Sequence, residues 1–272
     1  MHRASALVRT LKTPKGRSAF SGSRGAGVVA RSVLPTDMVV QTRQDRREEL
    51  GFEAVVANLC RAVANAGACQ PVSARHAAVL VPLFEDPATR RTHVVLTQRA
   101  AGLRSHGGEV CFPGGKREEG DADDVATAVR EAQEELGLDP NSVRVLGCLG
   151  PVLSKHLLSV TPVLATIPAR HAFHPNPDEV QAVFAPPLHT FLEASDLHSS
   201  REATFAPGMP YRLHFFDYQA ADREWYSVWG LTAAMLIDIA SKGFGRDPDF
   251  EALPPGYVPM HAGMFDDQTQ TG

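Results

Sequence analysis

The sequence predicts an α/β (α+β) domain in which a mixed β-sheet lies between α-helices. Apolar residues recur at helical spacing in two long segments, 46–66 and 123–136. Elsewhere the chain has short runs rich in β-branched and aromatic residues, which are typical of strands. Hydrophobic residues make up 43% of the 272 residues and charged residues 21%, so the chain has enough apolar surface for a sizeable core.

The helices are predicted from periodicity and from the residues at their ends. In the first, apolar residues recur from Leu50 to Val63, and Gly67 follows the last turn. The second has acidic residues at its start and Gly137 directly after its end, as the helix dipole and a left-handed cap favour. Further helical segments are expected at 187–192 and 231–241.

The first two strands are predicted to pair, because the turn signal Asp86-Pro87 separates them. The last two strands are also expected to pair. The glycine-rich stretch 102–120 is expected to be mostly loop. The expected strands are 77–84, 93–99, 143–149, 158–167, 182–184, 211–218 and 225–229.

The N-terminal segment, 1–45, differs in composition from the rest of the chain. Residues 1–43 carry eight basic side chains, several serines and Asp37 as their one acid. Such a composition is typical of a mitochondrial or chloroplast transit segment, and a disordered basic tail is the alternative. We predict a mitochondrial protein, with a cytoplasmic location as the alternative. The remaining divisions are an N-terminal helix at 46–72, a folded domain at 73–242 and a loose C-terminal tail at 243–272.

Several classes of function are excluded by composition. A formal net charge of −4 gives no support for nucleic acid as the main partner. The sequence has no run of about eighteen apolar residues, so no membrane span is expected. Four cysteines without C-x-x-C spacing do not predict a disulfide scaffold or a structural zinc site.

The chemistry is concentrated on the helix expected at 123–136. Val125, Val129, Ala132 and Leu136 fall within one narrow arc and form the expected buried stripe. Three glutamates fall on a different arc, where their like charges repel each other. A hard divalent cation bound by carboxylate oxygens would offset that repulsion, whereas the alternative is a solvated acidic face. The three glutamates are Glu131, Glu134 and Glu135.

A glycine loop precedes this helix and favours the metal interpretation. Phe112-Pro113-Gly114-Gly115-Lys116 supplies backbone that can approach a ligand closely. Its free N–H and C=O groups can point at phosphate or metal. A glycine loop alone is weak evidence, but its combination with three glutamates on one helical face is rare.

These residues resemble the signature of the Nudix hydrolases, in which a glycine precedes Arg-Glu-U-x-Glu-Glu-x-Gly-U, with U an aliphatic residue. Two departures are visible. Asp121 stands where the general signature has Glu, and eight residues rather than seven separate it from the arginine. We expect Asp121 to be structural. The matching residues are Gly115, Arg130, Glu131, Ala132, Glu134, Glu135, Gly137 and Leu138.

A second motif resembles the coenzyme A diphosphatase branch of that family. It runs from Leu96-Thr97-Gln98-Arg99-Ala100 to Gly108-Glu109-Val110-Cys111-Phe112-Pro113-Gly114-Gly115. A third similarity lies at Val228-Trp229-Gly230-Leu231-Thr232-Ala233. The resemblance covers about 77–239 and implies the Nudix fold. It also implies hydrolysis of coenzyme A or its derivatives to 3′,5′-ADP and 4′-phosphopantetheine or its acyl form.

The resemblance implies a site that holds Mg²⁺ or Mn²⁺. Glu131 and Glu135 are the first choices as ligands, the Gly115 carbonyl adds an oxygen, and Glu134 is a third ligand or the base that activates water. Arg130 is expected to orient the glutamates through ion pairs. Arg99, Arg104 and His106, together with Gly114 and Gly115, are the candidate substrate-binding residues, since arginine suits bidentate phosphate contact. For Arg99 the alternative is a surface charge at the end of a strand.

Other assignments remain open from sequence. Glu179 is a candidate for a later acidic group of the site. The domain is expected to bind a small molecule. The sequence gives no prediction of the oligomeric state. One alternative is a Nudix hydrolase of another nucleoside diphosphate derivative, such as ADP-ribose, a dinucleoside polyphosphate or an oxidised nucleotide. Another is a catalytically silent module that binds a nucleotide or RNA. Five aromatic residues are expected to pack in the core and strands: Phe215, Phe216, Tyr218, Trp225 and Trp229.

Overall fold

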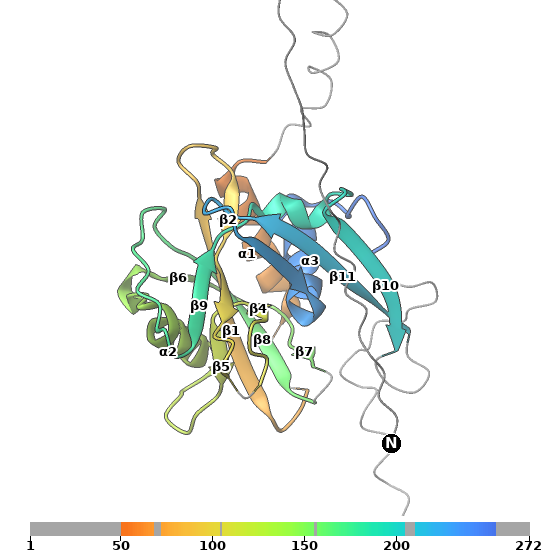
Figure 1. Ribbon diagram of the computed structural model, residues 1–272. Helices are drawn as coiled ribbons and strands as arrows, with labels where there is room; N and C mark the ends of the chain where they lie inside the picture. Colours follow the sequence, from red (N-terminus) through yellow and green to blue (C-terminus); the bar gives the residue numbers. More distant parts are fainter. Residues whose placement is uncertain (1–49, 68–71, 104, 155–156, 205–209, 254–272) are drawn as a thin grey trace, which may run out of the picture. The chain divides into compact units, whose positions relative to one another are not determined.

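The computed structural model of the protein describes residues 50–67, 72–103, 105–154, 157–204 and 210–253. Three α-helices and several strands build the fold (Figure 1). The helices are α1 (Phe52–Ala66), α2 (Asp124–Leu136) and α3 (Gly230–Phe244), with short 3-10 turns η2 (Pro140–Ser142) and η3 (Leu188–Leu192). The strands are β1 (His76–Glu85), β2 (Thr92–Val94), β3 (Leu96–Arg99), β4 (Val110–Cys111), β5 (Gly114–Lys116), β6 (Arg144–Cys148), β7 (Val152–Leu153), β8 (Ser159–Thr166), β9 (Val180–Phe184), β10 (His198–Thr204), β11 (Pro210–Gln219) and β12 (Trp225–Trp229).

The predicted mixed sheet is confirmed. Strands β1 and β8 run parallel at its centre, and the order β2-β1-β8-β6 is extended by β5 on β1 and β7 on β8, all antiparallel. Two smaller antiparallel sheets, β4-β3-β9 and β10-β11-β12, complete the domain.

Helices cover both faces of the central sheet, because β1 and β8 bury side chains on both faces. Ala78 and Leu80 pack with α2, whereas Val81 and Leu83 pack in the cluster that contains α1 and α3. Figure 1 shows α2 on one side of the sheet and α1 and α3 on the other. The packing of these two clusters fixes the sheet beneath the acidic helix.

Helix α2 has the ends that its sequence predicts. The Asp123 carboxylate accepts a hydrogen bond from the Ala126 N–H at 2.8 Å, which satisfies one of the free amides of the first turn. Gly137 follows in a left-handed conformation, with φ of 65°, and its N–H donates to carbonyls of the last turn. The helix is therefore held at both ends by local chemistry.

Some predicted boundaries are wrong. The first helix begins at Phe52 rather than at 46, because Gly51 is its extended N-cap. The segment 93–99 forms two strands, β2 and β3, which belong to different sheets. The expected loop at 102–120 contains β4 and β5, and β10 was not predicted.

The start of the expected C-terminal tail is also ordered. Gly243 and Phe244 belong to α3, and Phe250 and Ala252 pack against the core. Of the aromatic residues expected in packing, Phe216 is buried but Trp225 is 55% exposed. Residues 1–49, which include the predicted transit segment, and residues 254–272 lie outside the described part of the chain.

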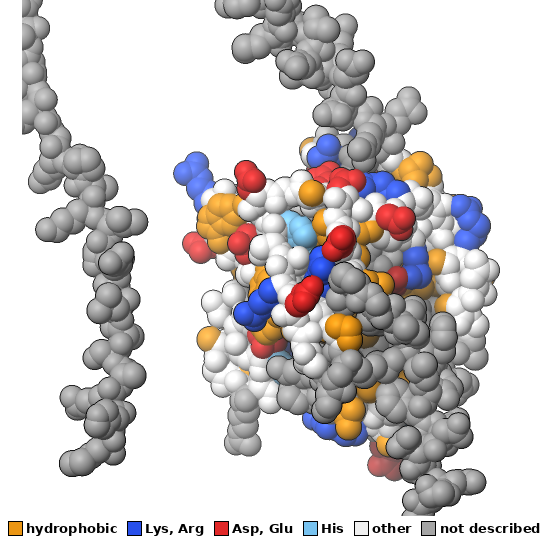
Figure 2. All heavy atoms as spheres, turned by 90° about the vertical axis from the view of Figure 1, so that its right-hand side faces the viewer, with side chains coloured by type: hydrophobic (Ala, Val, Ile, Leu, Met, Phe, Trp, Pro, Cys, Tyr) orange, Lys and Arg blue, Asp and Glu red, His pale blue; other side chains and the backbone are white. Residues whose placement is uncertain are grey.

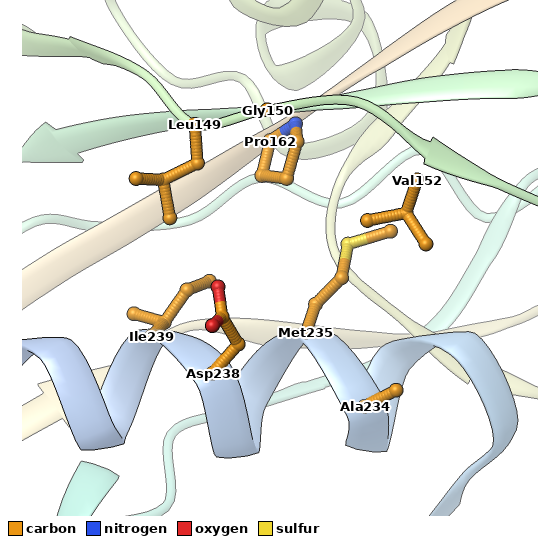
Figure 3. Close-up of a pocket in the computed structure, with 8 residues that line it drawn as sticks. All are labelled: Leu149, Gly150, Val152, Pro162, Ala234, Met235, Asp238 and Ile239. Carbon is orange, nitrogen blue, oxygen red and sulfur yellow. The ribbon is translucent and has the colours of Figure 1, made fainter. Parts of the chain in front are cut away.

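The surface toward β10 and β11 has acidic and basic side chains interspersed (Figure 2). Of the helices that the structure describes, none is both long and apolar enough to cross a bilayer. A cavity of about 120 Å³ lies between α3 and the central sheet, lined by Leu149, Gly150, Val152, Pro162, Ala234, Met235, Asp238 and Ile239 (Figure 3). It shares no residue with the predicted site.

Candidate active site

The glycine loop is held against α2 by backbone hydrogen bonds. The Pro113 carbonyl accepts from the Leu80 N–H at 2.8 Å, which fixes the loop to the central strand β1. The next N–H, that of Gly114, donates to Glu135 Oε2 at 3.1 Å. The strand that leads into the loop is held too, since the hydroxyl of Thr232 donates to the Val110 carbonyl at 3.1 Å. The loop and the acidic helix therefore form one unit.

Glu135 is the most buried of the three glutamates, with 2% of its surface exposed. Its Oε1 lies 3.4 Å from Arg99 Nη1, and Arg99 comes from β3 in the upstream motif. Burial raises the pKa of Glu135 to about 7, although the Gly114 N–H and Arg99 act in the opposite direction. The buried face of α2 is thus shifted from the predicted apolar stripe: it includes Glu135 and Ala128, whereas Val125 and Val129 are only half-buried.

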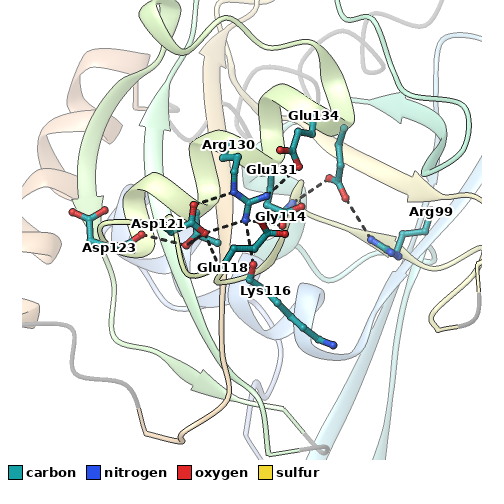
Figure 4. Close-up of polar contacts among 11 residues, drawn as sticks. Arg99, Gly114, Lys116, Glu118, Asp121, Asp123, Arg130, Glu131 and Glu134 are labelled. Carbon is teal, nitrogen blue, oxygen red and sulfur yellow. Dashed lines mark hydrogen bonds and ion pairs between the residues drawn. The ribbon is translucent and has the colours of Figure 1, made fainter.

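Arg130 connects the acidic residues to one another (Figure 4). Its Nε and Nη2 bind the two oxygens of Asp121 at 2.9 and 3.0 Å. Its Nη2 lies 3.1 Å from Glu131 Oε1, and its Nη1 lies 3.0 Å from Glu134 Oε2. The Asp121 hydrogen bonds, more than any other interaction, raise the pKa of Arg130, which stays charged. The ion pairs expected of Arg130 are present with Glu131 and Glu134, whereas Glu135 pairs with Arg99.

Glu131 and Glu134 have different surroundings. A Cβ atom placed on Gly115 would lie 2.3 Å from Glu131 Oε1, so only glycine leaves room for this carboxylate. Burial is the main cause of the raised pKa of Glu131, and Arg130 opposes it. Glu134, in contrast, has a side chain that is 54% exposed and is oriented by Arg130. The solvated acidic face therefore describes Glu134 but not its two neighbours.

Glu179 comes from a loop that docks on the C-terminal end of α2. The N–H of Asn176 donates to the Glu135 carbonyl at 2.9 Å, and the Asn176 side-chain amide donates to Glu179 Oε1 at 3.1 Å. The negative charge of Glu179 contributes to the raised pKa values of both Glu131 and Glu135. Glu134 contributes to that of Glu131. A fourth carboxylate thus lies in the electrostatic neighbourhood of the site.

The predicted substrate-binding residues are brought together only in part. Arg99 and Gly114 meet at Glu135, whereas Gly115 lies beside Glu131. His106 is exposed, has a positive φ of 58°, and lies 2.8 Å from Glu109 Oε2. Arg104 lies outside the described residues. The structure therefore places Arg99 closer to the metal candidates than the sequence indicates.

Comparisons with known proteins identify the family. The family model described as the NUDIX domain matches residues 74–207. Nudix hydrolase NudL of Photorhabdus laumondii, uncharacterized, is 39% identical over 171 residues, which are 62% of this chain and 84% of the relative. The chain belongs to the Nudix hydrolase family.

Two plant members of the Nudix family are more similar in sequence. Nudix hydrolase 15, mitochondrial, of Arabidopsis thaliana is 48% identical over 179 residues. Nudix hydrolase 22, chloroplastic, of the same plant is 46% identical over 184 residues. The matches cover 65% and 66% of this chain, and they span 61% and 59% of the plant proteins' own lengths.

The donor atoms of this Nudix site suit a hard divalent cation. Carboxylate and carbonyl oxygens are the ligands that Mg²⁺ and Mn²⁺ prefer. Glu135 is a buried carboxylate and Glu131 a half-buried one, a cation would stabilise both, and Gly115 lies beside Glu131. Within the described ranges, no three acidic, histidine or cysteine side chains already stand in a metal-binding group. The chemistry and the burial of these carboxylates fit the ion. In this structure, however, the carboxylates pair with Arg130 and Arg99.

Two residues of this Nudix site have roles that their sequence positions do not reveal. Arg99 is predicted to bind phosphate, but in the structure it pairs with the carboxylate of Glu135, 36 residues away. Asn176 gave no signal in the sequence, because its function depends on the loop docking against α2. The hydrogen bond that Asn176 donates to Glu135 could be found only from the three-dimensional fold.

Proposed function

We propose that this protein hydrolyses the diphosphate bond of coenzyme A or its derivatives, giving 3′,5′-ADP and 4′-phosphopantetheine or its acyl form. The observation that carries the proposal is the contact between Arg99 and Glu135 at 3.4 Å. Arg99 belongs to the motif that resembles the coenzyme A branch, and Glu135 belongs to the Nudix signature. Their contact supports one site built from both motifs.

The proposed reaction requires Mg²⁺ or Mn²⁺. Such an ion neutralises the charge of a diphosphate, orients it and lowers the pKa of a bound water. Glu131, Glu135 and the Gly115 carbonyl are the proposed ligands. Glu134 is the proposed third ligand or the base that accepts a proton from water, and Glu179 is proposed as a further acidic group of the site.

The cations of the chain have separate duties in this proposal. Arg130 positions Glu131 and Glu134, and it is itself held by Asp121. Arg99, which is 25% exposed at its side chain, keeps one edge available to a phosphate while it pairs with Glu135. Arg104 and His106 are proposed to bind substrate, where a 3′-phosphate adds charge beyond the diphosphate.

The test is a substrate panel with product identification. Coenzyme A, acyl-coenzyme A, dephospho-coenzyme A, ADP-ribose, a dinucleoside polyphosphate and an oxidised nucleotide are each supplied with Mg²⁺, with Mn²⁺ and with a chelator. We expect the highest kcat/KM for coenzyme A or a derivative, and no turnover in chelator. Preference for ADP-ribose or a polyphosphate would move the protein to another Nudix substrate class. Nucleotide binding without turnover in any metal would favour the silent module.

We also propose that residues 1–43 direct the protein to mitochondria. Their basic, acid-poor composition supports this location. The names of the two plant relatives point to two different organelles, the mitochondrion and the chloroplast. A cytoplasmic protein with a basic tail is the alternative outcome.

A further inference from the structure

Two histidines outside the candidate site are bound to each other. His198 on β10 and His214 on β11 lie with Nε2 and Nδ1 3.0 Å apart. The second nitrogen of His214, Nε2, lies 2.9 Å from the Ala252 carbonyl oxygen. His214 is 3% exposed, so this chain of hydrogen bonds runs through the interior of the domain.

The chain of bonds fixes where the protons lie. The Ala252 carbonyl can only accept, so His214 Nε2 carries a hydrogen and donates it. In neutral His214 the other nitrogen, Nδ1, is then a bare acceptor. His198 Nε2 must therefore donate to it. Both rings are neutral in this arrangement, and each hydrogen bond has one donor and one acceptor.

The pair holds the segment that follows α3. The ring of Phe250 lies 3.9 Å from that of His198 and 5.2 Å from that of His214, measured between centroids. His198 also stacks on Phe216 at 4.6 Å, and the rings of Phe216 and Phe250 lie 5.9 Å apart. The histidine pair therefore belongs to one ring cluster that joins the core to the C-terminal segment.

The surrounding charges also connect this segment to β11. Arg212 Nη1 lies 2.8 Å from Glu251 Oε2, and Arg212 Nη2 lies 3.7 Å from Glu202 on β10. Farther along the segment, Arg246 pairs with Asp249 at 3.1 Å. The charged group that acts on His214 is therefore Arg212, a cation, and its charge opposes protonation of the ring.

Added protons conflict with this geometry in two steps. One extra proton fits the hydrogen bond, but it places a charge in an apolar stack beside Arg212. A second extra proton leaves both facing nitrogens as N–H donors 3.0 Å apart, with no acceptor between them. The rings then have to separate. Burial accordingly lowers the pKa of His198 to about 4, and it also lowers the pKa of His214.

We propose that His198 and His214 form a pH-sensitive clasp, which holds residues 250–253 on the β10–β11 hairpin at neutral pH and releases them in acid. The released rings would regain an ordinary histidine affinity for protons. The clasp is therefore fully present above about pH 6.5 and is lost as the pH falls toward 4. The proposal does not depend on the proposed function, because it shares no residue with the candidate site.

Hydrogen–deuterium exchange of the full chain tests the clasp. The reporter is the segment 246–253, in which the Asp249 N–H donates to the Leu192 carbonyl at 2.8 Å. After correction for intrinsic exchange, we expect its opening equilibrium to rise about tenfold or more per pH unit below pH 6.5. If the protection of this segment in the wild-type protein did not change between pH 7.5 and 5, that result alone would overturn the proposal.

Variants assign the effect to the pair. His198→Phe with His214→Gln retains a ring on Phe216 and a donor for Ala252 but has no titratable group, so its protection should be independent of pH. His189→Gln is the matched control, because His189 also has a pKa lowered by burial to about 4 and packs on Phe244. It should keep the wild-type pH response. A response that persists in the double variant, or disappears in the control, contradicts the clasp.

Imidazole nitrogen NMR of the wild-type protein provides a separate readout. At pH 7.5 we expect His214 to be protonated on Nε2 and bare on Nδ1, with His198 titrating near pH 4 and the pKa of His214 below the ordinary histidine value. Ordinary titration of both rings near pH 6.5, with the segment still protected, would overturn the proposal.

Discussion

The carboxylate of Asp121 binds the guanidinium of Arg130 through two parallel hydrogen bonds, Oδ1 to Nε at 2.9 Å and Oδ2 to Nη2 at 3.0 Å. The Arg130 hydrogen bond is the main cause of the lowered pKa of Asp121, which therefore stays ionised. Oδ2 also accepts from the hydroxyl of Thr127 and the N–H of Glu118, both at 2.9 Å. Asp121 is the fixed point from which Arg130 reaches Glu131 and Glu134.

Replacing Asp121 with Asn should therefore lower activity, although Asp121 is not proposed to contact substrate and acts through Arg130. Arg130 would lose its charged partner and hold the two glutamates less firmly. We expect kcat or the affinity for Mg²⁺ to fall about 10- to 100-fold, as is usual when the partner of a site residue is lost. Measuring kcat against Mg²⁺ concentration checks this. Asp123→Asn is the control: Asn still caps α2, so wild-type kinetics are expected there, and equal losses in both variants would contradict the positioning role.

The two loop glycines should respond differently to alanine. At Gly115 a Cβ would meet Glu131 Oε1 at 2.3 Å, so Gly115→Ala should displace a proposed metal ligand and lower kcat while unfolding changes little. At Gly114 it would meet the Ala78 carbonyl at 2.4 Å, and φ is +154°. Gly114→Ala should therefore destabilise the fold, by at least about 1–3 kcal/mol. Melting temperature and kcat of both variants test the contrast, and an active Gly115→Ala enzyme would contradict it.

How much the sequence predicts depends on how local the cause is. Helix α2 is predicted closely, because Asp123 and Gly137 cap it from adjacent positions. Strand β10 is missed because its residues are mostly polar and exposed, and its pairing with β11 and the stacking of His198 stabilise it. The division of 93–99 likewise depends on distant partners, since Val94 binds the Pro186 carbonyl and Leu96 pairs with Phe184.

The site follows the same rule. The sequence predicts which glutamates share an arc of the helix, since that is local periodicity. It does not predict that Glu135 is buried, because burial depends on the Gly114 N–H and on Arg99 from another sheet. Nor does it predict that Arg130 leaves Glu134 exposed.

Arg104 lies outside the described residues, and its proposed role is tested through substrate. Arg104→Ala should weaken the use of coenzyme A more than that of dephospho-coenzyme A. Loss of one charge-assisted hydrogen bond is worth about 1.5–3 kcal/mol, or about 10- to 100-fold in kcat/KM. Arg90→Ala, at an exposed turn, should leave the ratio unchanged. Equal losses for both substrates would show that Arg104 does not bind the 3′-phosphate.

The N-terminal segment should be dispensable for catalysis. A protein that begins after Arg43 is expected to retain wild-type kcat/KM, because the proposed site residues all lie downstream. Residues 1–43 fused to a fluorescent reporter should direct it to mitochondria, and changing the eight basic residues to Gln should abolish import. Diffuse cytosolic signal from the unaltered fusion would reject the targeting role.

Glu135→Gln tests the proposed metal site. Gln keeps the size and one carbonyl oxygen, so the fold should persist, but a full charge and a strong ligand are lost. We expect turnover to be nearly abolished and the stabilisation of the fold by Mg²⁺ to weaken. Near wild-type turnover at modest Mg²⁺ would show that Glu135 is not a ligand. If Glu131→Gln and Glu134→Gln also kept near wild-type turnover, the proposed metal-dependent reaction would be excluded as well.

The same variant predicts a pH dependence of stability in chelator. Burial raises the pKa of Glu135 from its ordinary value of 4.5 to about 7. The folded protein then binds a proton more tightly than the unfolded chain does, so this group stabilises the fold fully below pH 4.5, and the stabilisation is lost as the pH rises through 7. The melting temperature of the metal-free wild type should therefore fall between pH 5 and 8 more than that of Glu135→Gln, which has no proton to lose.

Above pH 7 the variant should be at least as stable as the wild type, and adding Mg²⁺ should reverse the order, because only the wild-type carboxylate gains a cation. Parallel melting curves for the two proteins across this range in chelator would mean that Glu135 is solvated and ordinary, which contradicts both its burial and its proposed function.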